Sequence, residues 1–364
     1  MKPHPPAGPH GEQAFLESLY VALGTATGGA AAPGAGELLR RGVGDDAAVF
    51  AGPRADEAYV VSTDSMNEGV HFRLAWAPPR QVGAKLIAVS VSDVIAMGAV
   101  PRFGLLNLAA PRVSGADGGR GPTDLLWEIF LGASAAAARY GVTLIGGDTT
   151  ATAAGLALAS TVIGVGPSDR LLFRSGARPG DALFVSGELG AAATGLWLLE
   201  MDLDRRMRLL DRAPELKDAI DRQLCPDLSD ELELGPALAR DRLATAMMDI
   251  SDGLATDLRS LCAASRVGAL VDVGALPRSP AAVSAGRLGC PIEASALCGG
   301  EDYRLLFSAR PAATAALALL PRPPVRIGVM TSPEDGIVFA REGKPLNGDL
   351  FGYDAFPCAV HPES

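Results

Sequence analysis

The chain has 364 residues, of which 48% are apolar and only 5% aromatic, and its formal net charge is −10. This length fits two domains of ordinary size better than one, and an apolar fraction rich in Ala, Val, Leu and Ile suits sheets covered by closely packed helices. The acidic balance argues against a broad nucleic-acid-binding face, which must be basic, but it allows a nucleotide that is held through metal ions.

The cysteines and the apolar runs bear on the compartment. The five cysteines are scattered and include no C-x-x-C pair, so neither a disulfide framework nor a structural zinc site is indicated. No apolar run reaches the ~18 residues of a membrane span. The first residues also lack the pattern of a signal peptide. We therefore expect a cytoplasmic protein that neither crosses a membrane nor binds nucleic acid.

The predicted elements of the first half follow a flexible N-terminal segment, residues 1–36, in which only 12–23 has a helical pattern. An N-terminal domain is expected over 37–166. Short β-branched runs bounded by glycine or polar residues predict strands at 58–64, 142–150 and 156–166. A helix is predicted at 123–141, capped by Thr123 or Asp124 and stopped by Gly141. The run 83–99 is ambiguous by period, and its small residues favour a buried helix.

The second half begins in the polar, turn-rich stretch 166–181, where we expect the domain boundary. A C-terminal α/β domain is expected over 167–358, with a tail at 359–364. It opens with a strand and a glycine turn (ALFVSGELG), continues through helices to about residue 259, and ends in strands such as 303–307 and 325–330. The fold class expected is a two-domain α/β (α+β) protein.

Aspartates carry the chemical signal, because they are joined directly to sequence that favours burial. A buried carboxylate must be paired or bound to metal, and few of these have a nearby Lys or Arg. Magnesium takes oxygen ligands and shares them with substrate phosphates, so it is the natural partner. Nearby hydroxyl groups on Ser62, Thr63 and Ser251 could add ligands. The aspartates are Asp45, Asp46, Asp64, Asp93, Asp148, Asp249 and Asp252.

Each aspartate taken alone could instead be a helix cap or a turn residue. The repetition of the same pattern across the whole set argues against that explanation. Gly146–Gly147, before Asp148, would let a phosphate approach the backbone closely, although no P-loop is present. Arg174 has the fork that pairs with phosphate, or it is a solvated loop arginine. His71 is either a satisfied core residue or a ligand-binding one.

Seven motifs occur in the order seen in thiamine-monophosphate kinases, and the chain resembles that family from about Gly42 to Phe307. A weaker similarity follows in FGYDAF (351–356). The seven are GVGDDAAVF, VVSTDSMNEGVHF, KLIAVSVSDVIAMGAVP, LIGGDTT, RSGARPGD, MDISDGLATDL and GGEDYRLLF.

The resemblance implies a two-domain fold like that of aminoimidazole ribonucleotide synthetase. It implies a homodimer in which the N-terminal sheets of two subunits join, with ATP bound near that junction. The implied reaction is phosphorylation of thiamine monophosphate to thiamine diphosphate, with ATP as co-substrate and several Mg²⁺ ions. Direct in-line transfer without a phosphoenzyme fits an acceptor phosphate that is already largely deprotonated at neutral pH.

Residue roles follow from the same resemblance. The catalytic set is Asp64, Asp148 and Asp252. The magnesium set is Asp46, Ser62, Thr63, Asp64, Asp93, Asp148, Asp249 and Asp252. The ATP contacts are Gly147, Asp148, Arg174 and Ser251, and the thiamine phosphate contacts are His71, Glu301 and Tyr353.

Departures from the family pattern keep other functions open. Ala355 stands where many relatives carry a histidine in the closing motif, and the helix at 123–141 has Phe130 and Leu131 where relatives often carry a tyrosine near the nucleotide. The alternatives are a sibling enzyme of selenophosphate or aminoimidazole nucleotide synthesis, and a non-catalytic protein that binds nucleotide or divalent cations. No cysteine precedes Cys225, which argues against selenophosphate synthesis. No cysteine ends the chain, which argues against a role in hydrogenase maturation.

Overall fold

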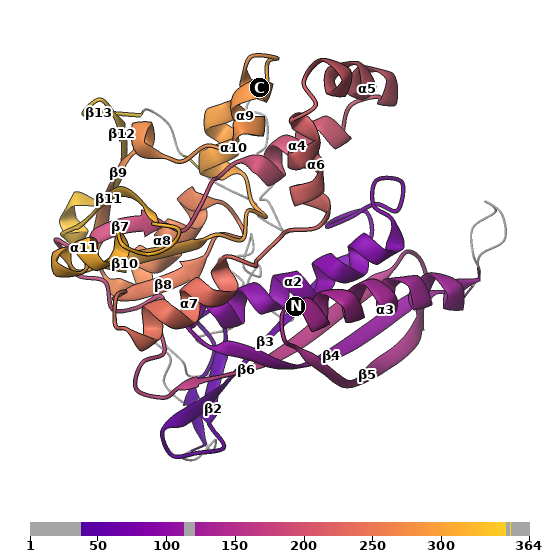
Figure 1. The fold of residues 1–364 in the computed structure, drawn as a ribbon, viewed down its shortest axis with the longest axis horizontal. Coiled ribbons are helices and arrows are strands. Elements are labelled where there is room, and N and C mark those ends of the chain that lie inside the picture. Colours follow the sequence, from indigo (N-terminus) through magenta and orange to yellow (C-terminus); the bar gives the residue numbers. More distant parts are fainter. Residues whose placement is uncertain (1–37, 113–120, 347–349, 351–364) are drawn as a thin grey trace, which may run out of the picture.

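The computed structural model describes residues 38–112, 121–346 and 350. Within them the chain forms two mixed sheets, one from each half, with helices packed between and around them (Figure 1). The sequence-based expectation of a two-part α/β fold is therefore confirmed. The helix expected at 12–23 lies outside the described residues, as do Tyr353 and Ala355.

The N-terminal sheet has the strand order β1-β2-β3-β6-β4-β5, and all neighbours are antiparallel except the parallel pair β4 and β5. Its strands alternate buried and exposed side chains because one face packs on helices, as the burial pattern of β6 shows most cleanly. The strands are β1 (Leu39–Arg41), β2 (Ala48–Ala51), β3 (Glu57–Asn67), β4 (Val100–Pro111), β5 (Thr143–Thr152) and β6 (Ala157–Pro167).

Two helices, α2 (Pro79–Ala96) and α3 (Pro122–Arg139), cover that face and pack closely on each other. Gly83 and Gly132 permit the approach, because a Cβ on either would lie 1.9 Å from a backbone oxygen of the other helix. The predicted cap of α3 is wrong. Gly121 is the N-cap, and Asp124 instead accepts a hydrogen bond from the Gly121 N–H at 3.0 Å.

Helix α2 is buried on almost every side, which explains why its sequence shows no amphipathic period. It lies between β3 and β6 of its own sheet and β8, α6 and α7 of the C-terminal half. One hydrophobic cluster accordingly runs through both halves, from Leu86 and Ile95 of α2 to Phe184 and Phe307 of the second sheet. Each fully buried side chain of this size contributes about 1.5–3 kcal/mol.

The C-terminal sheet has the order β13-β12-β9-β11-β7-β10-β8, with only β12 and β9 parallel. Its strands are β7 (Ala182–Val185), β8 (Ala246–Asp249), β9 (Gly268–Asp272), β10 (Leu305–Ala309), β11 (Val325–Thr331), β12 (Ile337–Arg341) and β13 (Lys344–Pro345). Its helices are α4 (Ala191–Leu199), α5 (Leu203–Arg212), α6 (Leu216–Leu224), α7 (Glu231–Arg240), α8 (Leu254–Ser265), α9 (Pro280–Gly286), α10 (Ile292–Cys298) and α11 (Thr314–Leu317).

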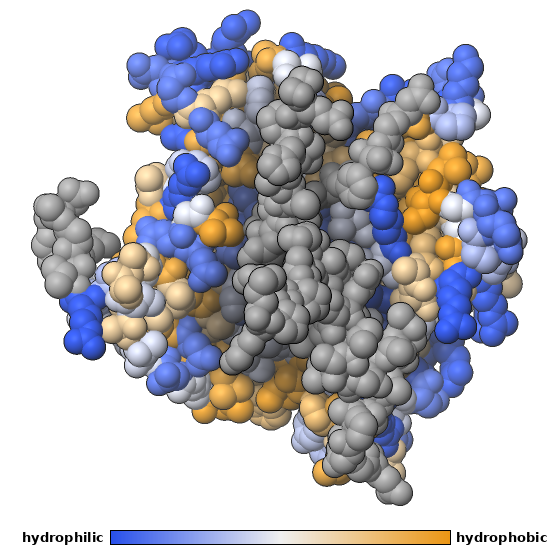
Figure 2. Space-filling model, turned by 180° about the vertical axis from the view of Figure 1, so that it is seen from behind, coloured by the Kyte–Doolittle hydropathy of each residue, from blue (hydrophilic) through white to orange (hydrophobic). Residues whose placement is uncertain are grey.

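The second face of the N-terminal sheet has no helix on it among the described residues. In Figure 1 the helices α2 and α3 lie in front of this sheet, and from behind, apolar side chains appear at the surface between hydrophilic ones (Figure 2). Phe50, Phe103 and Ile145 are 38%, 39% and 55% exposed. No helix in the described part of the chain is both long enough and apolar enough to cross a membrane.

Candidate functional site

Three carboxylates from three separate elements meet where the two halves join. Asp46 comes from the turn before β2, Asp93 from α2 and Asp249 from the last position of β8. One oxygen from each lies within 4.8 Å of the other two. The turn before β2 needs glycine at Gly44, whose φ is +106°. Of the aspartates singled out from the sequence, the structure brings these three together.

Each of the three carboxylates has one fixed partner. Asp93 accepts a hydrogen bond from the Ser62 hydroxyl, and Asp249 accepts one from Ser92 Oγ at 2.5 Å. Asp46 Oδ1 accepts a hydrogen bond from Arg174 Nε at 2.7 Å. Its other oxygen, Oδ2, is buried and has no hydrogen-bond partner among the described residues. A buried, unpartnered carboxylate oxygen beside two further carboxylates fits a bound cation.

The electrostatics of the group point the same way. Burial, and after it the charge of the nearby Asp46, raises the pKa of Asp249 from its ordinary value of 3.8 to about 7. Burial, followed by the charges of Asp64 and Asp249, raises the pKa of Asp93 well above its usual range. Arg174 is the cation that opposes these effects at Asp46. The described chain therefore holds more negative charge here than it balances, as hard-cation sites do.

Asp64 and Ser62 lie on the face of β3 that packs on α2. Ser90 Oγ of α2 donates to Asp64 Oδ2 at 2.7 Å, and burial raises the pKa of Asp64. The residue between Ser62 and Asp64 on β3, Thr63, points to the other face of the sheet. Thr63 is exposed there, with its hydroxyl 3.0 Å from Thr161 Oγ1. One chain therefore does not bring all three consecutive residues Ser62, Thr63 and Asp64 to one site.

Asp148 also lies away from the group, on the uncovered face of the sheet. It pairs in register with Asn107, whose partner on the next strand is Ala159, opposite Ser65 of β3. Its neighbour Gly147 is required by packing, since a Cβ there would lie 1.8 Å from the Leu106 carbonyl oxygen. Asp148 is exposed and lines a shallow pocket with Ser65 and Asn107.

The turn after β8 carries Ser251 and Asp252 and is fixed by a residue that the sequence analysis did not single out. Asp257 Oδ2 accepts hydrogen bonds from the backbone N–H of Asp252 at 3.1 Å and of Gly253 at 3.0 Å. The Ser251 carbonyl in turn accepts the Glu301 N–H at 2.8 Å. The GGED loop is thereby attached to the turn that follows Asp249.

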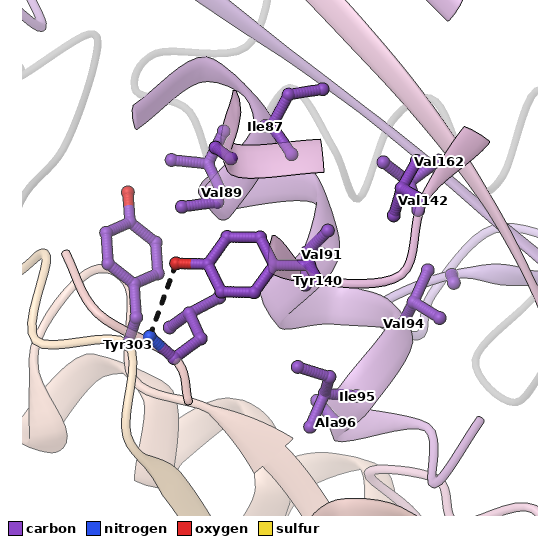
Figure 3. Close-up of a cluster of buried hydrophobic side chains, with 14 of the residues drawn as sticks. Ile87, Val89, Val91, Val94, Ile95, Ala96, Tyr140, Val142, Val162 and Tyr303 are labelled. Carbon is purple, nitrogen blue, oxygen red and sulfur yellow. Dashed lines mark hydrogen bonds between the residues drawn. The ribbon is translucent and has the colours of Figure 1, made fainter. Parts of the chain in front are cut away.

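A second polar group surrounds Lys85, which the sequence analysis also missed. Its Nζ lies 2.6 Å from Glu301 Oε1, and its side chain is only 3% exposed. Gln223 of α6 donates to the other Glu301 oxygen. Tyr303, from the same loop as Glu301, is buried beside the side chains of α2 (Figure 3). The sequence feature that could have indicated Lys85 is its position inside a run of apolar residues.

His71 and Arg174 each have contacts that narrow their roles. The backbone N–H of Asn67 donates to His71 Nδ1 at 3.1 Å, and the ring is half-buried. The backbone N–H of Arg174 donates to Asp45 Oδ1 at 3.0 Å, while Asp45 Oδ2 lies 3.2 Å from Arg41 Nη2. Arg174 is therefore an ordered residue of the junction and not a solvated loop arginine.

Comparisons with known proteins agree with this architecture. The profile of the AIR synthase related protein N-terminal domain matches residues 44–166, and that of the C-terminal domain matches residues 178–341. The thiamine-monophosphate kinase of Escherichia coli O157:H7 is 38% identical over 321 residues, which are 86% of this chain and 91% of the relative. The Bacillus subtilis thiamine-monophosphate kinase is 33% identical over 72% of this chain and 76% of the relative.

Solved structures show the same similarity. AaThiL complexed with AMPPCP and TMP has a TM-score of 0.75 at 27% identity, covering 95% of this chain and 97% of that one. The thiamine-monophosphate kinase of Stenotrophomonas maltophilia K279a has a TM-score of 0.65 at 33% identity, covering 86% and 93%. The hydrogenase maturation protein HypE of E. coli, at 20% identity, shares the fold alone.

Fold and site thus define the class of AIR synthase related proteins, whose two domain profiles match in order along the chain. Within that class, the chain belongs to the thiamine-monophosphate kinase family.

Proposed function

We propose that the protein transfers the terminal phosphoryl group of ATP to the phosphate of thiamine monophosphate, giving ADP and thiamine diphosphate. An acceptor phosphate oxygen forms a bond to the γ-phosphorus while the bond from that phosphorus to the β,γ-bridging oxygen breaks. The names of the relatives and of the ligands in the AaThiL structure support this. The observation on which the proposal rests is that the carboxylates of Asp46, Asp93 and Asp249, which the described chain does not fully neutralise, lie in the same junction as the polar group of Lys85 and Glu301.

We propose that Asp46, Asp93 and Asp249 hold Mg²⁺, because their oxygens converge and Asp46 Oδ2 has no other partner in the described chain. Ser62 and Asp64 lie on β3, which packs against α2, and Asp252 lies in the turn after β8. When bound, the metal would supply positive charge that offsets the repulsion between two phosphate groups. Several ions per site would match the number of carboxylates.

The chain's own residues then act by positioning. A phosphate monoester has a second pKa near ~6, so the acceptor oxygen needs no strong general base at neutral pH. We assign Arg174, Gly147 and Ser251 to ATP, and His71 and Glu301 to thiamine monophosphate. Tyr353 keeps the same predicted role but lies outside the described residues. Direct in-line transfer follows, because none of these assignments requires a phosphorylated side chain.

We also propose a homodimer that joins the uncovered faces of two N-terminal sheets. That face exposes an apolar patch made by Phe50, Tyr59, Val61, Phe103 and Ile163. Strand β5 lies at the edge of the sheet, where its backbone groups are open to pairing. Asp148 and Thr63 lie on the same face, so a partner subunit could use them although their own carboxylate group cannot. Apolar patches of this kind mark association surfaces.

We expect the protein in a reducing cytoplasm. Among the described residues, Cys225, Cys262 and Cys290 are free thiols, which agrees with that location.

The test is product formation from ATP, Mg²⁺ and thiamine monophosphate, with selenide and an aminoimidazole nucleotide precursor as parallel acceptors. We expect equal amounts of ADP and thiamine diphosphate. Consumption of ATP with another acceptor would retain the metal and nucleotide assignments and reject thiamine monophosphate. ATP binding without turnover on any acceptor would instead favour a nucleotide-binding protein.

A further inference from the structure

The ammonium group of Lys85 is buried in the junction, and all of its hydrogen-bonding capacity is used. An ammonium group has three N–H donors. Lys85 Nζ lies 2.6 Å from Glu301 Oε1, 3.1 Å from the Gln223 carbonyl oxygen and 3.4 Å from the His71 carbonyl oxygen. Its three acceptors thus come from the loop after β3, from α6 and from the GGED loop.

Two of those three acceptors belong to residues that we assign to thiamine monophosphate. His71 comes from the N-terminal half and Glu301 from the C-terminal half, and Lys85 is the side chain that contacts both. The Glu301 carboxylate is fixed at both oxygens, by Lys85 and by the Gln223 amide. It remains 25% exposed, and each carboxylate oxygen has a second lone pair for a ligand.

The backbone of the GGED loop is held separately from the Glu301 side chain. Glu301 has φ +65° and Tyr303 has φ +48°, a region that non-glycine residues rarely adopt. The N–H groups of these two residues donate to the carbonyl oxygens of Ser251 and Ile250, each at 2.8 Å. The backbone is therefore held from the C-terminal half, whereas the Glu301 side chain is oriented by Gln223 of that half together with Lys85 of the N-terminal half.

Lys85 also links this group to the metal-site carboxylates through one rigid helix. Asp93 is eight residues further along α2, which is about 12 Å along the helix axis. We propose that Lys85 is a positioning residue that fixes Glu301 and the His71 loop, and so sets the binding geometry of the thiamine end of the acceptor. This inference rests on the proposed function, because it takes Glu301 and His71 as acceptor contacts.

The test compares Lys85→Met, Lys85→Arg, Glu301→Gln and the double variant Lys85→Met/Glu301→Gln. Lys85→Met should raise the KM for thiamine monophosphate about tenfold or more, because loss of a charge-assisted hydrogen bond leaves the carboxylate unoriented. The KM for ATP and kcat should change by less than about threefold, since ATP is held elsewhere. Lys85→Arg keeps the charge but has a planar fork, so we expect an intermediate KM.

The double variant decides whether Lys85 acts through Glu301. Its KM for the acceptor should be no higher than that of Glu301→Gln alone, as expected for two residues that act as a unit. Multiplicative effects, or an equal rise in both KM values, would overturn the inference in favour of a structural tie between the halves. If Lys85→Met fails to fold, a double-mutant cycle of Lys85→Arg and Glu301→Gln makes the same comparison.

Arg80→Met is the matched control. Arg80 is on the same helix and pairs with Glu128 at 2.6 Å, but it is 63% exposed and far along the helix from Asp93. Arg80→Met should leave both KM values unchanged.

Calorimetric titration with thiamine monophosphate separates the proposed function from the proposed role of Lys85. A wild-type chain that binds thiamine monophosphate without turnover rejects the proposed function, and the affinities of the variants still decide the role of Lys85. A wild-type chain that does not bind it rejects both.

Discussion

The carboxylates of Asp46, Asp93 and Asp249 and the carboxylate of Glu301 lie at the junction of the sheets, and they differ in how their charge is balanced. Asp46, Asp93 and Asp249 share one arginine, Arg174, and keep one oxygen without a partner in the described chain. Glu301 has a lysine and an amide for its two oxygens. The first group is suited to a mobile cation, whereas the second is a fixed part of the protein.

Burial of a carboxylate therefore does not by itself indicate catalysis. A carboxylate that the protein already neutralises supports geometry, and removing its partner destabilises the fold. A carboxylate whose charge the protein does not balance lowers the stability of the metal-free protein, and its role is to bind a ligand. Stability and activity should therefore respond in opposite directions to substitutions in the first group, and in the same direction in the second.

The largest effect is expected for Asp93→Asn. It should lower kcat by about 10²–10³-fold, the range seen when one preorganised electrostatic contact to a transition state is lost. Because burial and like charges raise the pKa of Asp93, the apo variant should unfold at a higher temperature than the apo wild type. Mg²⁺ should raise the unfolding temperature of the wild type by mass action and that of the variant much less.

Kinetics and thermal unfolding with and without Mg²⁺ provide the measurement. Asp218→Asn is the control, since Asp218 is an exposed residue paired with Arg222 on α6. A variant with near-normal turnover at saturating Mg²⁺ would remove Asp93 from the metal site. Apo destabilisation together with lost activity would show that Asp93 belongs with the fixed carboxylates.

The next largest effect is expected for substitution of Asp148, which within one chain lies near neither the three carboxylates nor Glu301. If a partner subunit uses it, Asp93→Asn and Asp148→Asn should each be nearly inactive alone. A mixture refolded together should regain activity, because one of the two sites in a mixed dimer then carries no substitution. Random pairing of equal amounts predicts about a quarter of wild-type turnover. Activity that stays at the level of the separate variants would contradict use of Asp148 in the partner's site.

Sequence reasoning located the aspartates of the junction because each adjoins or interrupts an apolar run, and burial of a charge needs a reason. It assigned Ser62, Thr63 and Asp64 to one magnesium set, whereas in one chain the Thr63 side chain points to the opposite face of β3 from the other two. Asp148 and Thr63 are expected at a site only if a second subunit is counted.

Lys85 could not be recognised from periodicity, for a physical reason. Helix α2 is covered by a sheet, a helix and the other half of the chain, so it has no polar stripe against which a buried lysine stands out. Its partners Gln223 and Glu301 are 138 and 216 residues away in sequence (223 − 85 and 301 − 85). Only the folded arrangement brings them to one ammonium group.

The smallest effect is expected at Asp302, another fixed carboxylate. It accepts hydrogen bonds from the Gly190 N–H at 2.7 Å and the Ala192 N–H at 3.3 Å, and burial raises its pKa from 3.8 to about 6. A raised carboxyl pKa means that the stability it contributes is fully present below pH ~4 and is lost as the pH rises through ~6.

Asp302→Asn, which keeps an acceptor oxygen but does not ionise, should avoid that loss. The free energy of unfolding of the wild type should therefore fall relative to the variant between pH ~4 and ~6, by at most about 3 kcal/mol. Denaturant unfolding of both proteins at several pH values measures the difference. A difference that is constant over this range would mean that Asp302 stays ionised in the fold, held by the N-terminal N–H groups of α4 more strongly than burial opposes them.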